Sequence, residues 1–68
     1  MIDDVVYIVR YVAEGSPIAE NYASAPDALA RIRKLLVHGV GYGYAIYADA
    51  SLFMNQMAIF ENLKIAAH

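Results

Sequence analysis

The chain has 68 residues, of which 60% are hydrophobic and 18% are charged, and its formal net charge at pH 7 is −2. This length allows a single domain, residues 1–68, and the acidic balance argues against general binding of nucleic acids or anionic membranes, which usually depends on a basic excess. A domain of about 60 residues buries only about 60% of the surface of its unfolded chain. A composition as apolar as this one therefore leaves apolar surface exposed to water, which predicts self-association.

The first predicted strand covers residues 5–13, where β-branched and aromatic residues are frequent and both faces are largely apolar. Such a segment is typical of a central strand. A turn signal follows at residues 14–17, and residues 18–23 then alternate between apolar and more polar positions. We expect these two strands to form an antiparallel hairpin, with the second strand nearer an edge of the sheet.

A helix is predicted over residues 25–38. Ser24 provides an N-cap hydroxyl, Pro26 is tolerated in the first turn, and Asp27 stands where a capping box usually has Glu. Gly39 supplies a left-handed C-cap of the Schellman type, which ends the helix. One face of this helix is apolar and comprises Ala25, Ala28, Leu29, Ile32, Leu35 and Leu36.

The third predicted strand, residues 40–48, has one nearly bare face and one loaded with large side chains. Glycine in a strand often marks the close approach of another backbone. We therefore expect a helix to pack against the bare face. That face holds Gly41, Gly43 and Ala45, and the loaded face holds Tyr42, Tyr44 and Ile46.

Residues 52–67 fit a second helix with two apolar sides. Its main apolar arc can cover a sheet face, and a smaller patch on another side comprises Met54, Ala58 and Ile65. The alternative is a hairpin whose strands are residues 52–54 and 57–60. The predicted fold class is α+β: a small ββαβα domain with an antiparallel hairpin, a third strand and two helices, expected to be oligomeric.

A hairpin followed by a capped amphipathic helix and another strand is loosely similar to the partial RNase-H-like fold of HicB-type antitoxins. That family has a third strand before its helix and a characteristic glycine-containing segment, and both are missing here. The resemblance implies a regulatory module that binds a protein or nucleic-acid partner. We keep this function as an alternative.

No group of residues has the types and spacing of a known catalytic, cofactor or metal site. The serines Ser16, Ser24 and Ser51 are explained as turn or cap residues, without the base and acid that nucleophilic catalysis requires. His38 and His68 lie far apart and no cysteine accompanies them, unlike the ligands of a zinc site. We therefore expect no enzymatic activity, no cofactor and no metal.

Two surfaces could serve binding. A basic stripe on the first helix is either a solvated face or a contact for an acidic partner, and it comprises Arg31, Lys34 and His38. The chain also has six tyrosines, which would cover one sheet face if the first and third strands were neighbours. Tyrosine suits a core beneath the second helix, a dimer interface or a small-molecule pocket.

The leading hypothesis is a homo-oligomeric binding or assembly module of the cytoplasm, with itself as partner. The absence of cysteine fits a reducing compartment, and the acidic residues Asp3 and Asp4 are unlike a signal peptide. The apolar stretch 35–54 is interrupted at Gly39, so no membrane span is expected. The predicted interface comprises Tyr42, Tyr44, Met54, Ala58 and Ile65.

Overall fold

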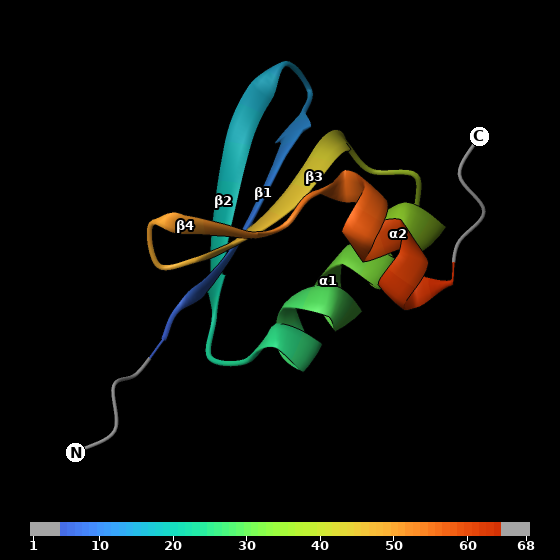
Figure 1. Ribbon diagram of the computed structural model, residues 1–68. Helices are drawn as coiled ribbons and strands as arrows, with labels where there is room; N and C mark the ends of the chain where they lie inside the picture. Colours follow the sequence, from blue (N-terminus) through green and yellow to red (C-terminus); the bar gives the residue numbers. More distant parts are fainter. Residues whose placement is uncertain (1–4, 65–68) are drawn as a thin grey trace.

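The computed structural model of the protein describes residues 5–64. Its four strands and two helices confirm the α+β class and the antiparallel hairpin, but the sheet has one strand more than the sequence predicts (Figure 1). In chain order the elements are β1 (Tyr7–Ala13), β2 (Ser16–Tyr22), α1 (Ala25–Val37), β3 (Tyr42–Ala48), β4 (Ser51–Met54) and α2 (Gln56–Leu63).

The strands form one sheet in the order β2-β1-β3-β4, and each neighbouring pair is antiparallel. Since β1 is antiparallel to both of its neighbours, β2 and β3 run parallel on either side of it and α1 crosses between them. Both helices lie on the same side of the sheet (Figure 1). The opposite side, which we call the open face, carries no helix within residues 5–64.

Local signals at both ends fix α1 where the sequence places it. The Ser24 hydroxyl accepts a hydrogen bond from the backbone N of Asp27 at 3.3 Å. At the other end Gly39 has a φ of 67°, and Val40 N donates to Leu35 O at 2.9 Å. This is the Schellman arrangement, so the predicted helix is confirmed, with His38 as its C-cap.

Ser24→Ala removes the N-cap acceptor and is expected to lower the free energy of unfolding by about 1 kcal/mol. Asp27→Ala is the matched control, because it keeps the acceptor and removes only a negative charge near the positive end of the helix, worth about 0.3–1 kcal/mol. Urea denaturation compares the two. Equal stability of Ser24→Ala and the wild type would contradict the capping geometry.

The predicted helix over residues 52–67 is wrong in its first part. Residues Ser51–Met54 form β4, which pairs with β3. The helix α2 begins only after Asn55, whose side chain accepts from Ala58 N at 2.8 Å. The alternative hairpin is wrong in its second strand, because residues 57–60 are helical. The predicted smaller patch therefore combines Met54 of β4 with Ala58 of α2. Residues 65–67 lie outside the described chain.

A β-bulge also divides the loaded face predicted for the third strand. The register between β1 and β3 shifts after Arg10, so that Tyr42 pairs with Val12 on the open face. Tyr42 is 65% exposed, whereas Tyr44 and Ile46 are buried beneath the helices. The helices thus pack on the face opposite to the one expected: a Cβ added at Gly43 would meet no atom within 4 Å.

The core lies between the helices and the inner face of the sheet. Its largest fully buried side chains come from both strands at the centre of the sheet and from both helices, and they are Val9, Ile32, Ile46 and Ile59. The rings of Tyr11 and Tyr44 stack with centroids 5.6 Å apart. For these two tyrosines the core-packing role is confirmed. Across residues 5–64, neither helix is long and apolar enough to cross a bilayer.

Candidate functional site

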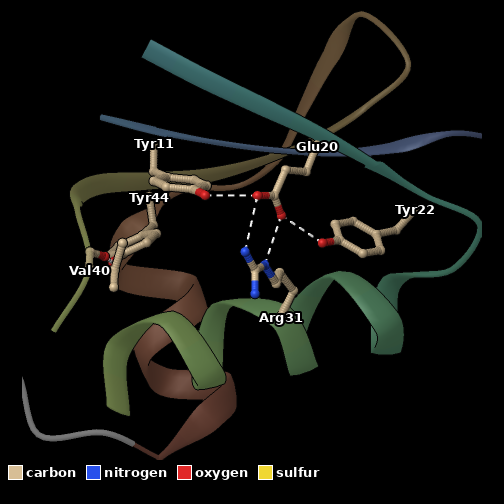
Figure 2. Close-up of polar contacts among 6 residues, drawn as sticks. All are labelled: Tyr11, Glu20, Tyr22, Arg31, Val40 and Tyr44. Carbon is tan, nitrogen blue, oxygen red and sulfur yellow. Dashed lines mark hydrogen bonds and ion pairs between the residues drawn. The ribbon is translucent and has the colours of Figure 1, made fainter. Parts of the chain in front are cut away.

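Glu20 is the centre of a polar cluster between the hairpin and α1 (Figure 2). The Tyr22 hydroxyl donates a hydrogen bond to Glu20 Oε1 at 2.6 Å, and the Tyr11 hydroxyl donates one to Glu20 Oε2 at 2.8 Å. Arg31 donates from Nε to Oε1 at 2.9 Å and from Nη2 to Oε2 at 3.3 Å. Both carboxylate oxygens are therefore engaged twice.

Strand register explains why these groups meet. Glu20 and Tyr22 are two residues apart in β2, so their side chains lie on the same face of the sheet. Tyr11 of β1 pairs with Ile18 and is therefore the diagonal neighbour of Glu20. Arg31 reaches them from α1 (Figure 2).

The hydrogen bonds from Arg31 hold the pKa of Glu20 at about 2, below its ordinary value of 4.5. Burial, and to a smaller extent the hydrogen bond to Glu20, raises the pKa of Tyr22 to about 12. Burial likewise raises the pKa of Tyr11. At neutral pH the carboxylate is ionised and the phenols are protonated. The cluster therefore anchors α1 to the hairpin through an ionised carboxylate that accepts from two neutral phenols and a guanidinium.

Tyr44 has a similar structural role at the start of α2. Its hydroxyl donates to Val40 O (Figure 2), and its backbone N donates to Gln56 Oε1 at 3.2 Å. Burial raises the pKa of this phenol. Only 4% of Tyr44 is exposed, so this residue of the predicted interface belongs to the core.

The open face is the side of the sheet that no helix covers within residues 5–64. At its centre the Arg10 guanidinium lies over the ring of Tyr47, 5.3 Å from the centroid. Two shallow hollows, of about 280 and 270 Å³, lie on either side of this pair, which lines both. The apolar side chains of this face are assigned by cross-strand pairing and comprise Ile8, Val12, Tyr42, Ala45, Tyr47 and Leu52.

A second apolar surface is a groove of about 540 Å³ between α1, β4 and α2. Leu29, Phe53 and Met54 line it, with Arg33 at one side. Arg33 Nη2 donates to Leu63 O at 3.1 Å, which links the two helices. Since residues of both helices line the groove, it lies on the helical side of the sheet.

The structure does not bring the predicted interface residues onto one surface. Tyr42 is on the open face, Met54 is in the groove, and Ala58 is half-buried on α2. Ile65 lies outside the described residues. Of the basic stripe, Arg31 is paired with Glu20, whereas Lys34 and His38 are exposed.

Sequence reasoning missed the roles of Arg10 and Glu20. Each is the one charged residue within its strand, Arg10 in β1 and Glu20 in β2. A lone charge between apolar neighbours is a usable signal, since such a group needs either a partner or solvent. The described residues contain no group of three or more His, Cys, Asp or Glu side chains that could hold a metal.

Comparison of the chain with protein-family models, with curated proteins and with solved structures finds no match.

Proposed function

We propose that the protein is a non-catalytic association module that works as a homo-oligomer, with the open face as its contact surface. One observation carries this proposal: both helices cover the same side of the sheet, and the other side is apolar (Figure 1). Sheets with one solvated face normally alternate apolar and polar residues. Here Tyr42 and Leu52 remain 65% and 55% exposed.

Charge does little to keep this face soluble. Within the strands, Arg10 is the one charged side chain that the register places there, since Glu20 is turned toward α1. Apolar surface that leaves water contributes roughly 25 cal/mol per Å². Association of this face therefore stabilises the folded chain, which has few buried side chains of its own.

The size of the open face indicates a modest interface. Three of the strands have seven residues and are about 23 Å long, β4 has only four residues, and four strands are about 19 Å wide. This area, about 440 Å² per copy, is below the usual range for stable complexes and is typical of weak, transient contacts. We expect the oligomer to dissociate on dilution.

The polar cluster supports a role in binding over one in catalysis. Every group in it is already paired with another side chain, and the Glu20 carboxylate accepts four hydrogen bonds. General acid–base catalysis needs a group that titrates near the working pH, and Glu20, with a pKa of about 2, does not.

The purified protein is expected to have a mass at least twice that of the 7.5 kDa chain by native mass spectrometry and light scattering. Leu52→Lys, on the open face, should shift the population toward the monomer, because it places a charge in the contact. Met57→Lys is the matched control, since Met57 is 71% exposed on α2. A wild type that stays monomeric at high concentration and melts cooperatively would refute the proposal.

A further inference from the structure

We propose that the open face pairs with the open face of a second copy across a two-fold axis that sets Arg10 of each copy against the partner's Asp49. This inference rests on the proposed function, because it names the arrangement of the same surface. It is carried by the charges on that face, by its hollows and by the symmetry that a self-contact requires.

The two charges lie on either side of one hollow. Arg10 and Asp49 both line the depression of about 270 Å³, and Ile8, Ala19, Tyr47 and Ala50 complete its wall. Both charged residues are exposed. Within residues 5–64 they form no ion pair with each other, so the opposite charges are available to a partner.

Both groups are held in place. The Arg10 guanidinium lies over the Tyr47 ring, a contact that restricts a long side chain. Asp49 Oδ1 accepts from Val6 N at 3.2 Å, and Asp49 N donates to Val6 O at 2.9 Å. Little conformational freedom remains to be lost when they meet a partner.

A two-fold contact requires a surface that is complementary to itself, and every contact in it occurs twice. When two faces oppose each other, the axis lies in the plane between them. An axis through the midpoint between Arg10 and Asp49, perpendicular to the line that joins them, brings each charge over the opposite charge of the second copy. Ile8 and Tyr47, in the wall between them, then pack near the axis against the same residues of the partner.

The shape of the open face fits this arrangement. Arg10 and Tyr47 line both hollows and therefore lie between them. Small residues contribute to both hollows, Ala19 and Ala50 to the smaller one and Gly43 and Ala45 to the larger one, which Val12, Pro17 and Ile18 also line. The hollow of about 270 Å³ beside Arg10 and Asp49 can therefore receive a side chain of the second copy.

The test uses Arg10→Glu and Asp49→Arg, each purified as the full chain. Alone, each variant places like charges against each other at both symmetric contacts and is expected to be monomeric. In an equimolar mixture, the new carboxylate faces the new guanidinium at one contact, and the native Asp49 faces the native Arg10 at the other. Native mass spectrometry should therefore detect a dimer that contains one copy of each variant.

Asp49 has a φ of 54°, a conformation that Asp and Asn tolerate better than Arg. Asp49→Asn is therefore the second variant: it keeps the turn and the acceptor for Val6 but removes the charge. It should raise the dissociation constant of the dimer by about tenfold. Ala30→Glu, at an exposed position of the groove, is the control and should leave the dissociation constant unchanged.

The outcomes separate the two proposals. A wild-type monomer would overturn both. A wild-type dimer that persists unchanged in Arg10→Glu and Asp49→Asn would overturn this arrangement and leave the homo-oligomer standing. Dissociation by Ala30→Glu would place the contact in the groove instead. Folded single variants that stay monomeric when mixed would equally contradict the pairing of Arg10 with the partner's Asp49.

Discussion

Gly41→Ala is expected to lower the free energy of unfolding by about 2–5 kcal/mol. Gly41 has a φ of 73°, and a Cβ added there would lie 2.7 Å from Val12 O and 2.8 Å from Tyr11 Cδ2. The left-handed conformation costs a non-glycine residue about 1–2 kcal/mol, and overpacking adds about 1–3 kcal/mol. Val12 O belongs to the backbone of a central strand and Tyr11 is stacked on Tyr44, so neither neighbour moves easily.

Gly43→Ala separates the cost of the left-handed conformation from the cost of overpacking. Gly43 has a similar φ of 71°, but an added Cβ would meet no atom within 4 Å. Only the conformational term applies, so the expected loss is about 1–2 kcal/mol. Urea denaturation of the wild type and both variants measures the difference. Equal losses at the two positions would show that β1 gives way at Gly41 and that the close approach is not a constraint.

Glu20→Gln is expected to destabilise the protein by about 1–3 kcal/mol at neutral pH and hardly at all near pH 2. The pKa of Glu20 is about 2 in the folded chain against an ordinary 4.5. A carboxyl whose pKa is lowered by folding contributes stability above its ordinary pKa, and that contribution is lost as the pH falls from about 4.5 to about 2. Because the Arg31 side chain is 36% exposed, solvent screening keeps the effect below the full value of the shift.

Denaturant unfolding of the wild type and Glu20→Gln at several pH values tests this dependence. The two curves of stability against pH should converge in acid. Glu61→Gln is the control, since Glu61 is an exposed residue of α2 and its replacement should change stability little at any pH. A constant difference between Glu20→Gln and the wild type across the acid range would show that ionisation of Glu20 does not support the cluster.

The sequence predicts α1 well because the signals for a helix are local. Ser24 and Gly39 act on backbone groups within a few residues of themselves. The periodic apolar residues between them predict the buried face of the helix without information about the element on which it packs. The hairpin of β1 and β2 is predicted for the same reason, since its turn lies between the two segments that pair.

Bulges defeat the same reasoning in the second half of the chain. A period of two residues assigns faces only while the register is unbroken. One bulge places Tyr42 and Tyr44 on opposite faces of the sheet. A second bulge leaves Phe53 without a partner in β3, between the paired residues Leu52 and Met54. The short β4 therefore reads as part of a helix, and the helix expected on the bare face lies on the opposite side.

The polar cluster depends on contacts that only the fold creates. Glu20, Tyr11 and Arg31 come from three different elements. Hairpin register could have placed Tyr11 near Glu20, but not the position of α1 above them. The open face is partly predictable, because the apolar character of both faces of β1 is evident in residues 5–13.

The position of β1 at the centre of the sheet has a consequence during synthesis. It leaves the ribosome before every strand it pairs with, and its second edge stays unpaired until β3 follows, after α1. An apolar strand with a free edge recruits strands of other chains. The nascent chain is thus most exposed to aggregation between the completion of the first hairpin and the emergence of Tyr42–Ala48, which pairs with the free edge of β1.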